Sequence, residues 1–329
     1  MSVPITPYTP NAMTAHWDVT FNMGAGFDMD SFKRFKGWLT FVAMVVGLAL
    51  VLGPRLHAQG LGWEGETGIF VTPLAYTASA EGQKIHPVVA YHYLNAGPVI
   101  GDFHEASIEV GVGKRLEFGY THEFHVFGGN PDISPLWQNG FDIFNGKVNV
   151  VRENYGSHKW VPAISTGFVF RPNVRNVGNW VEGSAVDPAH VSGKADGDIY
   201  VVATKFIPLK PIPVILSGGV RGTDAVLWGM GGNAPDWEAR AFGSAAFVFK
   251  APHHSTLILA SEVAQQPHHP LDFPTLNIPT TLTYAVRFIP PAKYKVTFDV
   301  GLAQIAGKVM PGVDLQARHQ VGVQMSYAF

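Results

Sequence analysis

The strongest constraint in this sequence is a strict alternation of apolar and polar residues. In KYKVTFDVGL, which begins at Lys293, one face carries Tyr294, Val296, Phe298, Val300 and Leu302, and the other carries Lys295, Thr297, Asp299 and Gly301. Because successive side chains of a strand point to opposite faces, this spacing predicts a β-strand with one apolar face. No segment after Gln59 has a sustained helical period, so the sequence predicts an all-β fold.

The number of such segments predicts what the apolar faces contact. Strands are expected near 87–95, 103–112, 115–126, 143–153, 160–171, 197–207, 213–222, 238–249, 255–264, 279–289, 293–303 and 315–329. About eight strands can enclose a side-chain core, but a barrel of about twelve is too wide to be filled by its own apolar residues. The polar faces must then line the interior, while the apolar faces meet lipid. We predict a transmembrane antiparallel up-and-down β-barrel of about 12 strands over residues 86–329, with 14 strands as the alternative.

Composition and loop lengths agree with this architecture. Only 15% of the residues are charged, against roughly 25% in ordinary soluble domains. Short connections are expected at 113–114, 154–159, 208–212, 250–254 and 290–292, and long ones at 127–142, 172–196, 223–237, 265–278 and 304–314. Outer-membrane barrels have short periplasmic turns and longer external loops, so this alternation places the carboxyl terminus on the periplasmic side.

The amino-terminal region predicts export. An apolar run from Gly37 to Gly53 follows Lys33, Arg34 and Lys36 and precedes a small residue at Ala58. This is typical of a secretory signal peptide over residues 29–58, with 1–28 as an upstream extension and the mature chain starting near Gln59. An uncleaved anchor is the alternative, although the run is short for a spanning helix. Together with the barrel pattern, the leader predicts the bacterial outer membrane as the location.

Residues 59–85 do not fit the strand count. GWEGETGIFVTPLAYTAS, from Gly62 to Ser79, resembles a strand, but as a spanning strand it would start the barrel outside the cell. We therefore expect it to form a periplasmic segment or a plug in the lumen. A paired thirteenth or fourteenth strand is the alternative.

The predicted register assigns charged residues of both signs to the lumen. They are Glu109, Glu117, Glu123, Lys147, Lys205, Arg221, Arg240, Glu262, Arg287, Lys295 and Asp299. Such residues can line a polar passage, or they can form salt bridges that brace and partly close the barrel. If one cluster steers an anion, we expect it to be Arg221, Arg240, Arg287 and Lys295, on neighbouring strands.

The sequence gives little support for nucleic-acid binding, metal binding or catalysis. A net charge of −2 without a basic stripe argues against nucleic-acid binding, and the absence of cysteine excludes thiolate metal sites. The histidines at 253, 254, 268 and 269 have no recognised ligand spacing and are interpreted as solvated loop residues. His190 and Ser192 lack a third catalytic partner, and no G-x-S-x-G motif is present. We expect no enzyme activity, no metal and no cofactor.

Several segments together resemble a known family. GWEGETGIFVTPLA, DGDIYVVATKF, PVILSGGVRGT, EARAFGSAAFVF and the final GVQMSYAF are similar to a domain-of-unknown-function family of Gram-negative outer-membrane β-barrel proteins. The resemblance implies architecture and location but carries no catalytic residues. The terminal strand, with Tyr327 and Phe329 on its apolar face, also resembles the signal that barrel-assembly machinery recognises. Outer-membrane lipid and that machinery are thus the expected partners, with a small polar solute as a further one.

Three functions remain open from the sequence. The first is a narrow passive or gated channel for small polar or anionic solutes. The second is a plugged structural or accessory barrel that serves envelope integrity or export of a surface polymer. The third is a lipid-modifying outer-membrane enzyme.

Overall fold

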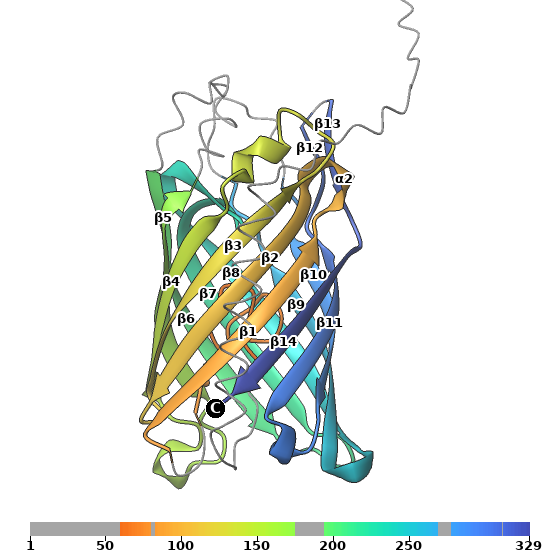
Figure 1. Ribbon diagram of the computed structural model, residues 1–329. Helices are drawn as coiled ribbons and strands as arrows, with labels where there is room; N and C mark the ends of the chain where they lie inside the picture. Colours follow the sequence, from red (N-terminus) through yellow and green to blue (C-terminus); the bar gives the residue numbers. More distant parts are fainter. Residues whose placement is uncertain (1–59, 80–82, 175–193, 269–277, 311) are drawn as a thin grey trace, which may run out of the picture. The chain divides into compact units, whose positions relative to one another are not determined.

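Twelve antiparallel strands close into a barrel in the computed structural model, which describes residues 60–79, 83–174, 194–268, 278–310 and 312–329 (Figure 1). From β1 to β11 each strand pairs with the next in sequence, β11 pairs with β14, and β14 closes the barrel against β1, with Val88 opposite Ala328. The barrel strands are β1 (Ile85–Asn95), β2 (Gly101–Val112), β3 (Leu116–Phe127), β4 (Phe141–Val151), β5 (Ala163–Val174), β6 (Lys194–Ile207), β7 (Val214–Leu227), β8 (Gly231–Ala251), β9 (Ser255–Ala264), β10 (Thr281–Ile289), β11 (Val296–Gln304) and β14 (Gln320–Ala328). The predicted twelve-stranded barrel is confirmed.

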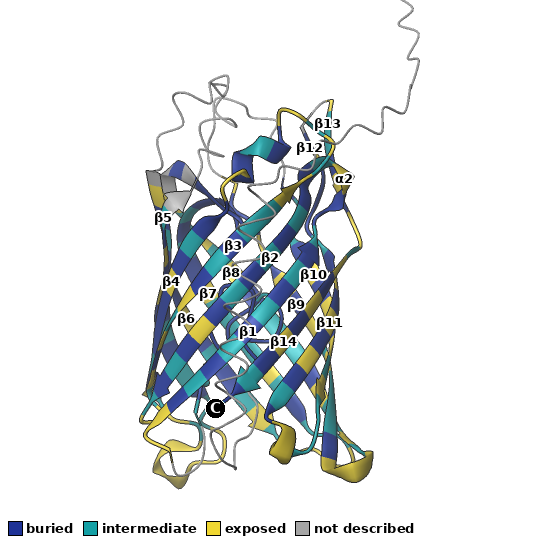
Figure 2. Cartoon of the chain, in the orientation of Figure 1, coloured by how far each residue is buried: buried dark blue, intermediate teal, exposed yellow. Residues whose placement is uncertain are grey.

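Apolar side chains cover the outer wall. In the β10–β11 pair, Val286 lies opposite Val300 and Arg287 lies opposite Asp299. Val300 is 55% exposed, whereas Asp299 is 2% exposed. Figure 2 shows the same alternation of exposed and buried residues along β11. The apolar set therefore points away from the barrel and the charged set points into it, as the width of a twelve-stranded barrel requires.

The two ends of the barrel differ in their connections. Both the start of β1 and the end of β14 lie at one end, which we call the periplasmic end in keeping with the predicted orientation. There the strands are joined by short turns, three of which contain the 3-10 turns η2 (Tyr155–Ser157), η3 (Pro252–His254) and η4 (Ala292–Tyr294). The external end carries the short helix α2 (Gly97–Ile100), the 3-10 turn η1 (Ser134–Trp137) and most of the longer connections.

Two predicted loops are wrong. The segment 223–237 is not a long loop, because β7 and β8 continue through it and leave only residues 228–230 as the turn. The second is the loop expected at 304–314. A separate hairpin of β12 (Ala306–Met310) and β13 (Val313–Ala317) occupies this region and the start of the predicted last strand. The last barrel strand, β14, begins only at Gln320. In both cases strand pairing satisfies backbone groups beyond the membrane-spanning part of the chain, where a loop was expected.

The carboxyl terminus is tied to its neighbours by backbone hydrogen bonds. The Ala328 N–H donates to the Lys295 carbonyl at 2.9 Å, and the Phe329 N–H donates to the Pro87 carbonyl at 3.0 Å. The Tyr327 and Phe329 rings meet edge to face, with centroids 5.3 Å apart. Recognition of these two residues by assembly machinery stays a prediction.

The expected leader, residues 1–58, lies outside the described residues, as do His190, Ser192 and His269. In the described part of the chain, no helix is both long enough and apolar enough to cross a bilayer.

The outer wall yields the first testable prediction. We expect Val286→Arg to lower the free energy of unfolding by about 2–4 kcal/mol, since it puts a cation against hydrocarbon near mid-wall. Ile85→Arg is the matched control because Ile85 starts β1 at the periplasmic rim, where the cost falls to about 0–1 kcal/mol. Denaturant titration of both variants in lipid vesicles measures the difference, and equal costs would contradict a depth-dependent lipid contact.

Candidate functional site: the luminal plug

Residues 60–79 lie inside the barrel, where they contact side chains from strands all around the wall. We call this segment the luminal plug; it appears in orange between the strands of Figure 1. It turns back on itself through isolated bridges between Leu61 and Thr67 and between Gly68 and Pro73. Nearly all its residues are buried. Of the positions that the sequence left open, the structure therefore places this segment in the lumen.

A buried ion-pair network holds the plug to one side of the wall. The Glu64 carboxylate of the plug contacts the Arg171 guanidinium, and it accepts from Arg221 at 2.5 Å. Arg171 also donates to Asp196 at 2.6 Å and to Asp198 at 2.8 Å, and Arg221 reaches Asp198 at 2.5 Å. The charged groups of all five side chains are at most 2% exposed. Because an unpaired buried charge costs several kcal/mol, Glu64 and the wall residues depend on one another.

A single carboxylate on β9 holds the tip of the plug. Glu262 accepts from three consecutive backbone N–H groups, those of Phe70 at 3.2 Å, Val71 at 3.0 Å and Thr72 at 2.8 Å. The Thr72 hydroxyl donates to the same carboxylate at 2.7 Å. Hydrogen bonds to an ionised acceptor are worth more than neutral ones, so this contact fixes the backbone of the loop.

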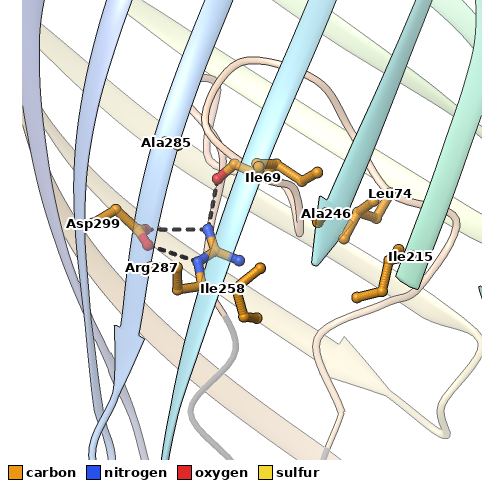
Figure 3. Close-up of a pocket in the computed structure, with 9 residues that line it drawn as sticks. Ile69, Leu74, Ile215, Ala246, Ile258, Ala285, Arg287 and Asp299 are labelled. Atoms are coloured by element: carbon orange, nitrogen blue, oxygen red, sulfur yellow. Dashed lines mark hydrogen bonds and ion pairs between the residues drawn. The ribbon is translucent and has the colours of Figure 1, made fainter. Parts of the chain in front are cut away.

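Arg287 binds the plug from the neighbouring strand β10. Its guanidinium pairs with Asp299 at 2.7 Å and donates to the carbonyls of Gly68 at 3.0 Å and Ile69 at 2.5 Å. Figure 3 shows the guanidinium between the Asp299 carboxylate and the Ile69 carbonyl. The small cavity beside it, about 30 Å³, is lined by Ile69, Leu74, Ile215, Ala246, Ile258, Ala260, Ala285, Arg287 and Asp299. This side of the interior is thus largely apolar, unlike the β2–β6 side.

The pair Glu117 and Lys147 binds the plug on the opposite side. The two side chains are 2.6 Å apart and completely buried. Lys147 donates to the carbonyls of Thr67 at 3.0 Å and Leu74 at 2.9 Å. Glu117 accepts from the N–H groups of Thr67 at 3.0 Å and Ala78 at 2.6 Å. An irregular segment in a protein interior needs such partners for its backbone, and here wall side chains supply them.

Glycines of the inner wall make room for the plug. Gly301 and Gly322 are opposite each other on β11 and β14, and the Phe70 ring lies over both. A Cβ atom on Gly322 would overlap that ring, and one on Gly301 would lie 3.1 Å from it. The Phe70 ring thus occupies space that any larger residue at position 322 would fill.

An apolar cluster covers the external side of the plug. Trp63, Phe103, Trp137, Trp228 and Met230 are all buried in it. The Trp63 indole donates to the Gly229 carbonyl at 2.8 Å, and the Trp137 indole donates to the Met230 carbonyl at 2.8 Å. The turn between β7 and β8 is therefore fastened both to the plug and to η1, which explains why the 223–237 segment is ordered rather than a free loop.

Most of the predicted lumen residues do face inward. Inner-face positions are occupied by Glu109, Glu117, Glu123, Lys147, Arg221, Glu262, Arg287 and Asp299, all buried except Arg287, which is partly buried. Arg240 is partly exposed and pairs with Glu238. Lys295 is buried, but it lies in the turn before β11.

Lys205 is a correction. It lies opposite Leu216, which is 44% exposed on the outer wall, and it pairs at 3.0 Å with Glu153 in a periplasmic turn. The even-numbered residues of β6, including Asp198 and Thr204, face the lumen instead. In the sequence ATKFIP near the end of the strand, the two faces are about equally apolar. The pattern therefore did not show which residues face the lumen, and Lys205 was assigned to the wrong face.

Several acidic or basic residues of the lumen were not among the predicted ones. Glu105 is four residues before Glu109 on the same strand and therefore faces the same way, so the alternation could have identified it. Arg171, Asp196 and Asp198 lie toward the external ends of β5 and β6. Asp196 falls in the loop expected at 172–196, and Arg171 and Asp198 lie at the ends of the expected strands 160–171 and 197–207 on either side of it. Glu64 and Glu66 belong to the plug, whose strand-like sequence does not indicate which residues of the wall it contacts.

The predicted anion-steering cluster is not assembled. Arg221, Arg240 and Arg287 are each engaged by a carboxylate. In contrast, Glu66, Glu109 and Glu123 form no ion pair with a lysine or arginine of the described chain, and Glu105 reaches only His92, at 3.5 Å. Burial, together with the nearby Glu64, raises the pKa of Glu66 in the plug to about 8. The titratable groups of the interior that lack an ion-pair partner are therefore acids, and burial keeps Glu66 largely neutral near pH 7 while the plug is in place.

Comparison with known proteins gives similar folds only. No family model and no curated protein matches the chain. An outer membrane channel from Pseudomonas putida F1 has 11% identity and a TM-score of 0.44, with 78% of this chain and 97% of that chain covered. The β domain of the Bordetella autotransporter BrkA has 10% identity and a TM-score of 0.37, covering 74% and 99%. OmpT, an outer membrane protein of Vibrio cholerae, has 10% identity and a TM-score of 0.33, covering 74% and 98%.

The contact between Phe70 and the glycine pair predicts a measurable coupling. Gly322→Ala should destabilise the barrel by about 1–3 kcal/mol, because the added methyl overpacks against the Phe70 ring. The same substitution should cost close to nothing in a Phe70→Ala background, and a double-mutant cycle by denaturant titration measures this.

Gly218→Ala is the matched control, since a Cβ at that position meets no atom nearer than 3.6 Å. Additive effects of Gly322→Ala and Phe70→Ala would show that the ring does not rest on the glycines.

Proposed function

We propose that this protein is an outer-membrane channel for small polar solutes that its own luminal plug holds closed. One observation carries the proposal: the charged side chains that would line a passage, among them Arg221, Glu262 and Arg287, bind plug residues instead. The apolar outer wall and the expected export signal support the outer-membrane location. No catalytic step and no cofactor is assigned to the barrel.

The strength of these contacts favours a gated channel over a passive one. A hydrogen bond to a charged group contributes about 1.5–3 kcal/mol, and Glu262, Glu117, Lys147 and Arg287 each make more than one to the plug. Moving the plug away would also leave Arg171 and Arg221 without the Glu64 carboxylate. Opening therefore needs an input that replaces these contacts, such as a bound solute or a force on the amino-terminal side of the plug.

The interior charge favours cations over the anions expected from sequence. The lumen cations are taken up by carboxylates, while Glu105, Glu109 and Glu123 lie along β2 and β3 without such a partner. Buried without a cation, these carboxyl groups are neutral in the closed barrel; they ionise when the plug moves and water enters, and they then attract a passing cation. The proposed solutes are therefore small, polar and neutral or cationic.

A second candidate is a permanently plugged accessory barrel. The apolar cluster at the external end, with Trp63, Trp137 and Trp228, favours it because a solute would also have to pass this cover. The two candidates differ in whether loosening the plug creates a conducting path.

Single-channel recording in planar bilayers tests the proposal. We expect the wild type to be silent or to open rarely, and the double variant Glu64→Gln, Glu262→Gln to show ohmic steps, because it removes two anchors of the plug. Reversal potentials in a salt gradient should indicate cation preference. Lys308→Ala, an exposed position on β12, is the matched control and should behave as the wild type.

Folding of every variant is checked by the shift in gel mobility between heated and unheated samples. If the double variant folds and still does not conduct, the channel is excluded and the plugged accessory barrel is favoured.

A further inference from the structure

Polar and aromatic side chains gather on the outer wall over β1 to β4. They lie on the outer face because the residues that alternate with them, such as His92, Glu105 and Thr121, are buried on the inner face. We call this set the outer-wall patch; it consists of Tyr91, Tyr93, His104, Ala106, Tyr120, His122, Phe124 and Asp142.

Hydrogen bonds connect the polar groups of the patch. The Tyr120 hydroxyl donates to Asp142 Oδ1 at 2.6 Å, and His122 Nδ1 lies 2.8 Å from the same oxygen. On the neighbouring strands, the Tyr91 hydroxyl lies 2.6 Å from His104 Nδ1. These contacts fix the orientation of the carboxylate and of both imidazoles, so the patch presents a preformed set of polar groups.

The rings of the patch surround a small residue. The register places Ala106 between Tyr91 on β1 and His122 on β3. The Tyr93 and His104 rings have centroids 5.2 Å apart, and the His122 and Phe124 rings meet edge to face at 4.4 Å. Ring faces and edges thus flank a position occupied only by a methyl group.

The patch lies toward the external end of the wall. Asp142 is the second residue of β4, and Tyr93 is two residues before the end of β1. Closer to the periplasmic end, the outer faces of the same strands carry Ile108, Phe118 and Val150, all exposed and apolar. A carboxylate is costly in the hydrocarbon region but not at its boundary, and aromatic residues gather at that boundary. The patch therefore fits the level of the outer-leaflet headgroups.

We propose that the outer-wall patch binds the saccharide headgroup of an outer-leaflet glycolipid. Sugar hydroxyls both donate and accept, and the patch offers a carboxylate, phenol hydroxyls and imidazole nitrogens together with flat rings for the apolar face of a sugar. It contains no lysine or arginine, the residues that hold a phosphate, and the Asp142 carboxylate would repel one. The inference needs the outer-membrane location but not a conducting lumen.

Native mass spectrometry of the full barrel in a zwitterionic, sugar-free detergent tests this site. The probes are rough-type lipopolysaccharide and, as a lipid without sugar, phosphatidylethanolamine. We expect the wild type to retain lipopolysaccharide, and the double variant His122→Ala, Asp142→Ala to bind it at least tenfold more weakly. Binding of phosphatidylethanolamine should be the same in both.

Trp237→Ala is the matched control, because Trp237 is an exposed aromatic near the external end of β8, outside the patch. It should bind lipopolysaccharide as the wild type does, and Tyr120→Phe should weaken binding less than the double variant. The proposal is overturned if the wild type prefers neither lipid, if Trp237→Ala weakens binding as much as the double variant, or if the patch variants change only the association of barrel copies. None of these outcomes depends on channel activity.

Discussion

The width of a twelve-stranded barrel is the constraint on which the rest of this structure depends. Such a cylinder is too wide for side chains from its own wall to meet at the centre. The protein fills the space with a piece of backbone, residues 60–79, and that backbone brings N–H and C=O groups that need partners in an environment shielded from bulk water. The wall meets this need with charged side chains, so Glu117, Lys147, Glu262 and Arg287 act as hydrogen-bonding anchors rather than as the surface of an open pore.

Two closures of different chemistry follow from this arrangement. Near the external ends of β5 and β6 the plug is held by ion pairs around Glu64, which are specific and break only when the charges find other partners. An apolar cluster covers the plug on its external side. Trp63 is a residue of the plug and also a member of this cluster, and its indole reaches the turn between β7 and β8. Movement of the plug would thus be felt at the external mouth. In the proposed channel, this connection would let one segment control the whole passage.

The outer wall and the lumen were predictable to different degrees. Alternation alone placed Val300 outside and Asp299 inside, because a barrel in lipid permits only one orientation of an amphipathic strand. It failed at Lys205, where the strand end lacks contrast between its faces, and at Asp196, because β6 begins at Lys194 inside the loop expected at 172–196. Alternation also could not show that charges on β5 and β6 meet a residue from the start of the chain.

The sequence by itself determined the class of fold, the closure of about twelve strands and the face that each strand turns to lipid, since these depend on the residue period and on barrel width. Only the tertiary structure decided where residues 60–79 lie, which side chains bind them and how the patch around Asp142 is assembled. The reason is distance along the chain: Glu64 meets Arg221, and Phe70 meets Gly322, through contacts that no local pattern records. An irregular segment takes its position from its partners, and those partners come together only when the barrel closes.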